Sequence, residues 1–379
     1  MENDSPPLKA LLVAEGSGGH LIPALEVANR LAKTGARIRV WYAQRPPIER
    51  LTRALAQSAA DASIDLDPIP MESSSNPLER LWRCGQLWRR AQRCFDTFSP
   101  DVVVGFGGWV SAPVVLAARK RRISCLLHEQ NVVLGRANRW LARWVDRVAV
   151  SFRETQTALN GTAAVMTGLP IRGEIGRAAT SADAQRFGCR EGRPTLLVLG
   201  GSQGARAINR LMVDVTRHLS PEERQTWQVL HLTGAADEAR VRETYAAQEM
   251  TAWVAPFLAE MDAAYAEADL VIARAGASTI AELARCGKPA ILIPYPHAGG
   301  HQRANAQLVQ RVGGGFMIEE PDATPERVLG TIRRLLTDAS LRSTMGAHIQ
   351  RLHCSDAAQR LTEAIIEVVR EGRRGDHDA

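Results

Sequence analysis

The sequence Lys9-Ala-Leu-Leu-Val-Ala-Glu-Gly-Ser-Gly-Gly-His20 runs from a short apolar segment directly into a cluster of glycines. The residues from 21 to 34 then place apolar side chains at 21, 24, 25, 28, 31 and 32, which is the period of an amphipathic helix, and Gly35 suits its end. Residues 37–42 are expected to form a strand. Strand, glycine-rich turn, helix and strand make a β-α-β unit, so this stretch predicts a parallel sheet covered by helices.

The same order of elements returns in the second half of the chain. Residues 193–199 are expected to contain a strand, Gly200-Gly-Ser-Gln-Gly-Ala205 supplies another glycine turn, and residues 206–219 fit a helix. Further strands are expected at residues 101–105, 124–128, 227–233, 270–273 and 290–294. We therefore predict an α/β protein with two Rossmann-like domains that face each other across a cleft.

We place the domain boundary in the segment Gly168-Leu-Pro-Ile-Arg-Gly-Glu174, which looks like a linker. The expected domains are residues 1–170 and residues 171–379, with allowance for a final helix that packs back on the first domain. The charged end of the chain, residues 370–379, is expected to be a solvated tail.

The composition is that of an ordinary soluble globular protein. Of 379 residues, 45% are hydrophobic and 23% are charged, which excludes a disordered or collagen-like chain. The six cysteines lie far apart and form no C-x-x-C pair, as is typical of reduced thiols in the cytosol. The acidic N-terminus does not fit a secretory signal, and the longest uncharged stretch, residues 102–118, is shorter than the ~20 apolar residues of a membrane span. We expect a cytosolic protein without a transmembrane helix.

Glycine turns that open helices expose backbone N–H groups where the helix dipole favours an anion, so they are able to hold a phosphate. Gly16–His20 and Gly200–Gly204 both qualify, although a tight turn without a ligand is an equally good interpretation of either one alone. Leu21 stands where the dinucleotide fingerprint G-x-G-x-x-G requires its last glycine, and neither turn continues into the G-K-[ST] of a P-loop. A nicotinamide-dependent dehydrogenase is therefore disfavoured.

A third turn, Ala273-Arg-Ala-Gly-Ala-Ser-Thr-Ile-Ala-Glu282, carries more information. We expect Ser278 or Thr279 to cap a helix here, and free amides near Gly276 to hold a diphosphate. Glu282 lies one turn further on, where a carboxylate suits the two hydroxyls of a ribose. A glutamate that merely favours the helix dipole is the alternative interpretation.

Together the motifs resemble the two-domain glycosyltransferases of the GT-B type, and most closely the MurG family. That family transfers N-acetylglucosamine (GlcNAc) from UDP-GlcNAc to undecaprenyl-diphosphoryl-N-acetylmuramoyl-pentapeptide (lipid I) in peptidoglycan synthesis. The matching segments, in family order up to about residue 312, are Gly16–His20, Gly105–Gly108, His128-Glu-Gln-Asn131, Gly200–Ala205, Arg274–Thr279 with Glu282, and His301-Gln302 with Asn305. The resemblance implies inverting transfer to the 4-hydroxyl of N-acetylmuramic acid, which makes lipid II.

The resemblance assigns the acceptor and the membrane side to the N-terminal domain and UDP-GlcNAc to the C-terminal domain. It implies that UDP-GlcNAc is bound by Ser17, Gly18, Gly19, Asn131, Arg172, Ser202, Leu258, Ala277, Ser278, Thr279, Ile280, Ala281, Glu282, Gln302 and Asn305. In this scheme Gln302 and Asn305 read the GlcNAc hydroxyls. From their spacing alone, Gln302 and Asn305 also fit the solvent-exposed face of a helix.

Other roles in the donor site follow from the same resemblance. Ser202 is expected at the diphosphate and Glu282 at the ribose. Leu258, with Phe257 beside it, is expected at the uracil. The guanidinium of Arg172 is expected near the leaving diphosphate, where a bidentate cation stabilises negative charge.

Displacement of UDP builds negative charge on the diphosphate, which helix-end amides are able to stabilise without a metal, and we expect no metal and no cofactor. The attacking hydroxyl must lose a proton to a base. His20 is the first candidate, His128 and Glu129 are the alternatives, and a purely capping or binding His20 is equally favoured. Asp65-Leu-Asp67 is similar to the metal-binding D-x-D of the other glycosyltransferase fold, but metal binding is disfavoured there.

Positive charge and tryptophan gather in one part of the chain. Residues 80–153 contain fourteen Lys and Arg against four acidic residues, and five of the eight tryptophans. Within residues 136–147, basic residues alternate with Trp140 and Trp144. Such a surface suits an anionic membrane, whereas a solvated helix over core tryptophans is the alternative. We predict a peripheral protein on the cytoplasmic face of the inner membrane.

The partners that we expect are UDP-GlcNAc, lipid I and the anionic inner leaflet. No recognised nucleic-acid-binding module is found, so a nucleic acid partner is not expected. The resemblance adds proteins of cell-wall synthesis and cell division. Trp109 replaces the usual tyrosine of the family, and Ala112-Pro-Val114 replaces its Gly-Pro-Gly. Two other functions stay open: a lipid glycosyltransferase acting on diacylglycerol, and a non-catalytic protein that binds a nucleotide sugar at a membrane surface.

Overall fold

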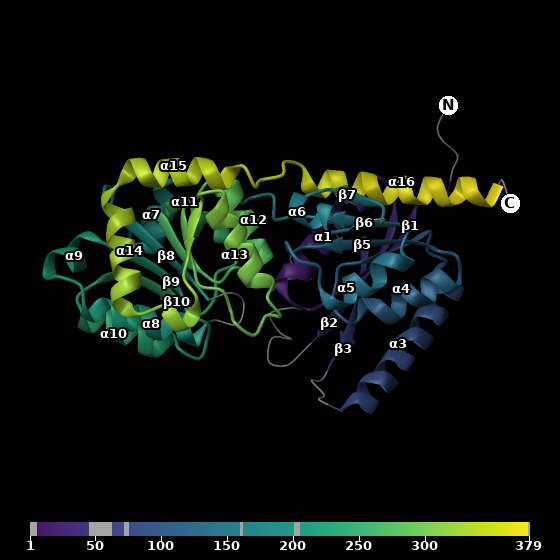
Figure 1. Cartoon of the computed structure of the whole chain (residues 1–379), viewed down its shortest axis with the longest axis horizontal. Helices are drawn as coiled ribbons and strands as arrows, with labels where there is room; N and C mark the ends of the chain where they lie inside the picture. Colours follow the sequence, from purple (N-terminus) through teal and green to yellow (C-terminus); the bar gives the residue numbers. More distant parts are fainter. Residues whose placement is uncertain (1–5, 45–62, 72–75, 160–161, 201–204, 378–379) are drawn as a thin grey trace. The chain divides into compact units, whose positions relative to one another are not determined.

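The computed structural model describes residues 6–44, 63–71, 76–159, 162–200 and 205–377 (Figure 1). The chain divides into two compact units. Unit 1 comprises Met1–Arg172 and Cys354–Ala379, and unit 2 comprises Gly173–His353. The chain therefore passes from unit 1 to unit 2 and returns for its last helix.

The described part of unit 1 contains a seven-stranded sheet in the order β3-β2-β1-β4-β5-β6-β7. All of its strand pairs are parallel. The strands are β1 (Lys9–Ala14), β2 (Arg37–Gln44), β3 (Ile64–Pro70), β4 (Val102–Gly105), β5 (Ser124–Glu129), β6 (Arg147–Val150) and β7 (Ala164–Met166). Because a parallel sheet is covered on both faces, its central strands are almost continuously apolar, which made them recognisable in the sequence.

Helices cover both faces of this sheet. They are α1 (Gly18–Ala32), α3 (Pro77–Phe98), α4 (Ser111–Lys120), α5 (Arg136–Leu141), the 3₁₀ helix η1 (Ala142–Trp144), α6 (Arg153–Thr157) and α16 (Ala357–His377). Helices α1 and α16 share one core with alternate residues of β1, including Leu12. Helices α3 and α4 share another core with the opposite residues, including Leu11. Because successive side chains of β1 point to opposite faces of the sheet, this strand contributes residues to both cores.

Residues 370–377, which we expected in a solvated tail, are helical, and residues 370–373 are exposed on that helix. Helix α16 continues to His377 and lies along unit 1 in Figure 1. Nη2 of Arg373 lies 2.7 Å from Oδ1 of Asp101, and the backbone of Gly372 lies against Ser124. The charged last turns of the helix thus contact unit 1 at Asp101 and Ser124.

Unit 2 contains a second parallel sheet, with six described strands in the order β10-β9-β8-β11-β12-β13. Its strands are β8 (Thr195–Leu199), β9 (Gln228–Leu232), β10 (Thr251–Ala255), β11 (Leu270–Ala273), β12 (Ala290–Leu292) and β13 (Gly315–Met317). Its helices are α7 (Ser181–Phe187), α8 (Arg206–Arg217), α9 (Pro221–Thr226), α10 (Glu238–Ala247), α11 (Met261–Glu267), α12 (Ala277–Cys286), α13 (His301–Arg311), the 3₁₀ helix η2 (Glu320–Asp322), α14 (Pro325–Thr337) and α15 (Ala339–Gln350). The predicted α/β class with two parallel sheets is confirmed.

The two sheets place the sequence motifs at their carboxyl edges. In unit 1, Val13 of β1 pairs with Gly105 of β4, so the turns after these strands are neighbours. In unit 2, Ala273 of β11 pairs with Leu292 of β12, so the turn before α12 lies beside the loop that leads to α13. Ligands of parallel α/β sheets bind at this edge, which makes these turns the place to look for a site.

Candidate active site

The first glycine turn opens α1 at the carboxyl end of β1. Ser17 is the N-cap residue, but its Oγ does not cap the helix and lies instead 2.6 Å from Nδ1 of His20. In the described part of the chain, the backbone amides of Gly18 and Gly19 have no acceptor. The turn thus combines uncapped N–H groups with a histidine whose ring is held from one side by a hydroxyl.

Two glycines after β4 let the next turn approach this loop. Gly107 and Gly108 have φ values of +83° and +76°, which favour glycine. A Cβ on Gly107 would lie 3.2 Å from Nε2 of His20, and one on Gly108 would lie 2.0 Å from Oε2 of Glu15. Both glycines are therefore needed for close packing against the first loop, which explains this match to the family.

His128 is buried at the end of β5 and is hydrogen-bonded through both ring nitrogens. Its Nε2 lies 3.1 Å from the carbonyl oxygen of Gly168, so this nitrogen carries the proton, and Nε2 of Gln130 donates to Nδ1 at 3.2 Å. Burial lowers the pKa of His128 to about 4. Gln130, to which sequence analysis gave no role, also donates to the carbonyl of Phe106 and so joins two turns.

Glu129 organises the loop that follows β5. Its Oε1 accepts hydrogen bonds from the backbone amide and Nδ2 of Asn131 at 3.0 and 3.2 Å. Its Oε2 accepts from the backbone amide of Gly135 at 2.9 Å and from Nδ2 of Asn138 at 2.8 Å. These contacts favour a supporting role for both Glu129 and His128, and they fix the loop that carries Asn131. His20 remains the predicted base.

The turn before α12 leaves three amides free. The N-cap is Gly276, and no side chain caps the helix, so the expectation that Ser278 or Thr279 provides the cap is wrong. The amide of Ile280 is the first to bond within the helix, to the carbonyl of Gly276. The amides of Ala277, Ser278 and Thr279 have no partner among the described residues, and neither does the buried Oγ of Ser278. The turn is therefore suited to an anion.

Glu282 lies on the same helix, one turn from these amides, and is 8% exposed. The hydroxyl of Tyr265 in α11 donates to its Oε2 at 2.8 Å. This tyrosine, which sequence analysis missed, orients the carboxylate.

The two residues expected at the uracil differ in exposure: Leu258 is buried, whereas Phe257 is exposed.

The polar residues of α13 are tied to the neighbouring turns. Asn305 is fully buried, and its Nδ2 donates to the carbonyl of Ala275 at 3.0 Å. Gln302 is partly exposed, and its Oε1 accepts from the backbone amide of Tyr295 at 2.9 Å. Ile280 is buried against the core, and Ala281 is partly exposed. The structure thus brings together the expected residues of α12 and α13 in unit 2.

The other residues that we expected at the donor site lie either outside the described residues or in unit 1. Ser202 lies in 201–204, outside the described residues. Arg172 is the last residue of the first segment of unit 1. Ser17, Gly18, Gly19 and Asn131 also belong to unit 1, so the expected site residues are divided between the two units.

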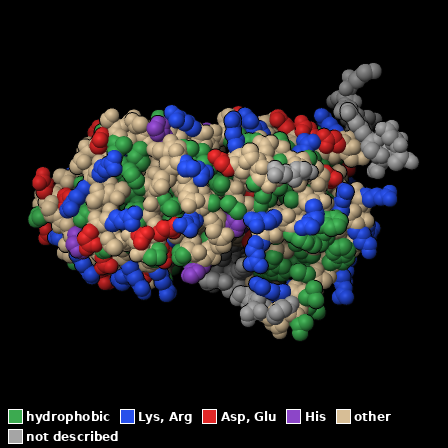
Figure 2. Space-filling model, viewed as in Figure 1, with side chains coloured by type: hydrophobic (Ala, Val, Ile, Leu, Met, Phe, Trp, Pro, Cys, Tyr) green, Lys and Arg blue, Asp and Glu red, His purple; other side chains and the backbone are tan. Residues whose placement is uncertain are grey.

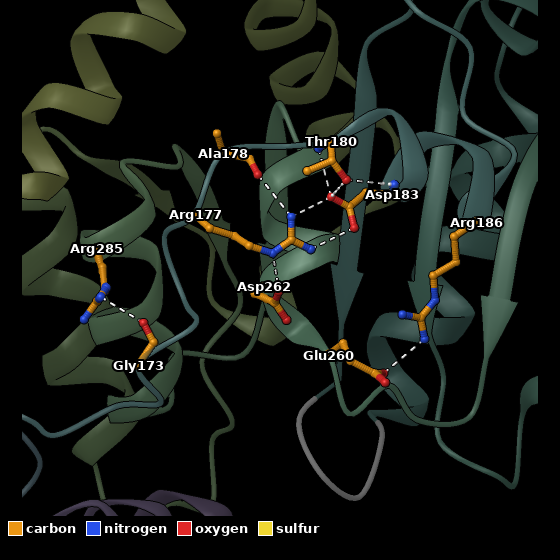
Figure 3. A network of polar contacts seen from close by, with 9 residues as sticks. All are labelled: Gly173, Arg177, Ala178, Thr180, Asp183, Arg186, Glu260, Asp262 and Arg285. Carbon is orange, nitrogen blue, oxygen red and sulfur yellow. Dashed lines mark hydrogen bonds and ion pairs between the residues drawn. The ribbon is translucent and has the colours of Figure 1, made fainter.

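The chain that enters unit 2 after Arg172 is anchored by arginines, as Figure 3 shows. Nη2 of Arg285 donates to the carbonyl of Gly173 at 3.0 Å. Arg177 binds Asp183 through two nitrogens, at 2.6 and 2.8 Å, and Asp262 through Nε at 2.5 Å. Hydrogen bonds from Arg177 lower the pKa of Asp183. The linker is therefore fixed to α7 and α11.

The two aspartates with D-x-D spacing lie in β3, an edge strand, and not in a loop. Asp65 pairs with Arg39, and Asp67 pairs with Arg90. No cluster of three or more His, Cys, Asp or Glu suited to a metal occurs among the residues that the structure describes. Each aspartate thus has a cationic partner of its own.

Comparison with known proteins finds relatives over most of the chain. Residues 10–150 match the glycosyltransferase family 28 N-terminal domain, and residues 195–361 match the glycosyltransferase family 28 C-terminal domain. The UDP-N-acetylglucosamine–N-acetylmuramyl-(pentapeptide) pyrophosphoryl-undecaprenol N-acetylglucosamine transferase of Syntrophotalea carbinolica is 37% identical, over 93% of this chain and 97% of the relative. The protein of the same name from Mesorhizobium japonicum is 38% identical, over 94% of both chains.

A solved structure agrees with these relatives. The crystal structure of Acinetobacter baumannii MurG superposes with a TM-score of 0.73 at 27% identity, covering 95% of this chain and 100% of that chain. The predicted GT-B architecture and glycosyltransferase activity are thereby confirmed. The chain belongs to glycosyltransferase family 28 and, within it, to the MurG family of N-acetylglucosaminyltransferases.

Proposed function

We propose that the protein transfers GlcNAc from UDP-GlcNAc to the 4-hydroxyl of N-acetylmuramic acid in lipid I, with inversion at the anomeric carbon, to make lipid II. The observation that carries this proposal is the start of α12. Three amides and the hydroxyl of Ser278 have no partner among the described residues, and the Glu282 carboxylate follows one turn later. Amides at a helix N-terminus suit a diphosphate, and a carboxylate suits a ribose diol.

The donor sugar lies, in this proposal, beside α13. Because Oε1 of Gln302 already accepts from Tyr295, its Nε2 points the other way and is the group that donates to a GlcNAc hydroxyl. Asn305 supports the same region by holding the Ala275 carbonyl. Leu258 and Phe257 contact the uracil. Ser202 and Arg172 complete the binding of the diphosphate, whose developing charge the N–H groups and the guanidinium stabilise.

The acceptor hydroxyl loses its proton to His20 in this proposal. When Nδ1 carries the proton and donates it to Oγ of Ser17, 2.6 Å away, Nε2 carries the lone pair that a base requires. His128 and Glu129 act through the loop of Asn131, which they hold by hydrogen bonds. Gly18 and Gly19 offer their amides to the donor or to the diphosphate of the acceptor.

A membrane-facing surface supports a lipid-linked acceptor. Leu78, Leu81 and Trp82 of α3 are 76%, 71% and 61% exposed, and Trp140 and Trp144 of the α5–η1 region are each 46% exposed. Figure 2 shows hydrophobic side chains bordered by Lys and Arg on this part of unit 1. Among the described residues, no helix has the length and apolar character to cross a bilayer. We propose peripheral attachment of this surface to the anionic cytoplasmic leaflet, where proteins of cell-wall synthesis and division are further partners.

A UDP-release assay with lipid I tests the proposal. We expect UDP-GlcNAc to support turnover far better than UDP-glucose or UDP-galactose. Release with diacylglycerol but not with lipid I would favour the related lipid glycosyltransferase. Binding of UDP-GlcNAc without release of UDP on addition of lipid I would favour a non-catalytic nucleotide-sugar-binding protein, and either result would overturn the proposal.

A further inference from the structure

Arg274, the first residue after β11, has a largely buried side chain that touches the loop after β12. Its Nη1 donates to the carbonyl of Ile293 at 3.1 Å and to that of Pro294 at 3.4 Å. Its Nη2 lies 2.5 Å from Oε2 of Glu320, and its Cζ lies 5.4 Å from the centre of the Tyr295 ring. One guanidinium therefore donates to two carbonyls and lies against a carboxylate and an aromatic ring, a combination that suits the planar fork of arginine.

The loop that Arg274 holds is the one that orients Gln302. The backbone amide of Tyr295 donates to Oε1 of Gln302, so the position of Tyr295 decides which way the Gln302 amide faces. Between Tyr295 and Gln302 the chain turns through Gly299 and Gly300, whose φ values are +60° and +83°. These glycines do not restrain the loop by side-chain packing. The loop is attached at the β11 end by the backbone hydrogen bond from Ile293 to the carbonyl of Ala273 at 2.9 Å and by the side-chain contacts of Arg274.

We propose that Arg274 is a positioning residue that determines donor-sugar specificity by fixing the loop from Ile293 to Gly300 and, through Tyr295, the Gln302 amide. The inference rests on the proposed function, in which Gln302 reads the donor sugar. Because the amides of α12 and Glu282 bind the UDP moiety, loss of the Arg274 contacts affects recognition of the sugar more than recognition of UDP. A site that offers a fixed hydrogen-bond donor discriminates between sugars, whereas a loosened one does not.

Arg274→Gln tests this, with Arg303→Gln as the matched control. Arg303 is a more exposed arginine that pairs through Nε with Glu319 at 2.7 Å, next to Glu320. The measurements are kcat/KM with lipid I for UDP-GlcNAc and for UDP-N-acetylgalactosamine, which differs from it only in the configuration of one sugar hydroxyl, the inhibition constant of UDP, and Tm. For Arg274→Gln we expect the preference for UDP-GlcNAc to fall ~10-fold, with UDP inhibition changed less than ~3-fold. Arg303→Gln should leave both quantities unchanged.

The conservative variant Arg274→Lys separates positioning from folding. Lysine keeps a cation opposite Glu320 but lacks the fork for both carbonyls, so we expect a Tm near that of the parent together with reduced preference for UDP-GlcNAc. An unchanged donor preference in Arg274→Lys, or equal losses of UDP binding and donor preference in Arg274→Gln, would overturn the inference. If the unmodified protein releases no UDP from UDP-GlcNAc, the proposed function fails instead.

Discussion

The substitution Glu129→Gln distinguishes between a supporting role and a catalytic-base role of the Glu129 carboxylate. Four N–H donors converge on the two oxygen atoms of Glu129, which is 1% exposed, at distances from 2.8 to 3.2 Å. A glutamine of the same shape must turn its NH₂ group toward one pair of these donors. Two hydrogen bonds to a charged acceptor are therefore lost, and buried donors face one another.

The expected loss of stability follows from these contacts. Two charge-assisted hydrogen bonds contribute roughly 1.5–3 kcal/mol each, so we expect unit 1 to lose about 3 kcal/mol after relaxation. For a unit of this size that lowers Tm by roughly 6–12 °C. Asp96→Asn in the same unit is the control, since its ion pair with Arg121 at 3.0 Å is exposed and contributes about 0–1 kcal/mol.

The assay is thermal unfolding together with UDP release measured well below the transition. We expect Glu129→Gln to lower Tm and to reduce kcat less than ~100-fold, because a general base contributes about 10²–10⁴-fold to the rate. A normal Tm combined with a larger loss of kcat, and loss of the acidic limb of the pH–rate profile, would refute the supporting role and make Glu129 the base.

Three further predictions concern His20, the buried histidines and the membrane-facing surface. His20→Ala should lower kcat by roughly 10²–10⁴-fold while KM for UDP-GlcNAc changes little in steady-state kinetics, and near-normal turnover would end its assignment as the base. Burial lowers the pKa of His128 to about 4 and that of His231 to about 3, below the value of ~6.5 for an unfolded chain. The unfolded chain therefore binds more protons in this range, so stability should be full above pH ~6.5 and fall, by roughly 3 kcal/mol for each histidine, as pH drops toward those values. Denaturant unfolding from pH 7 to pH 4 measures this, and a flat profile would contradict it. Trp82→Glu should weaken co-sedimentation with anionic vesicles, and equal binding of the parent protein to neutral vesicles would contradict the membrane surface.

The central strands and the glycine turns were predictable because buried parallel strands are continuous apolar runs. Strands β3, β6, β7, β10 and β13 were not predicted, and all of them except β6 lie at a sheet edge. β7 and β13 have three residues each, β6 has four, and β3 contains Asp65, Asp67 and two prolines. The helix through residues 370–377 was missed because its charges gave no sign of partners, and Arg373 finds Asp101 only in the folded chain.

The site was recognised by its motifs, but the roles within it depend on contacts that spacing does not encode. The sequence makes Glu129 a candidate base, whereas its hydrogen bonds with the amides of Asn131 and Gly135 favour a supporting role. The cap of α12 was assigned to a hydroxyl residue by preference, whereas Gly276 is the N-cap and the first amides of the helix have no acceptor among the described residues. Arg274 belonged to a recognised motif, yet its target loop follows the next strand.

The most direct test of the account is a crystal structure of the protein with UDP-GlcNAc bound. The account predicts diphosphate oxygens within hydrogen-bond distance of the amides of Ala277, Ser278 and Thr279, with the ribose hydroxyls on Glu282. A diphosphate held away from α12, or held through a metal ion ligated by protein carboxylates, would contradict it.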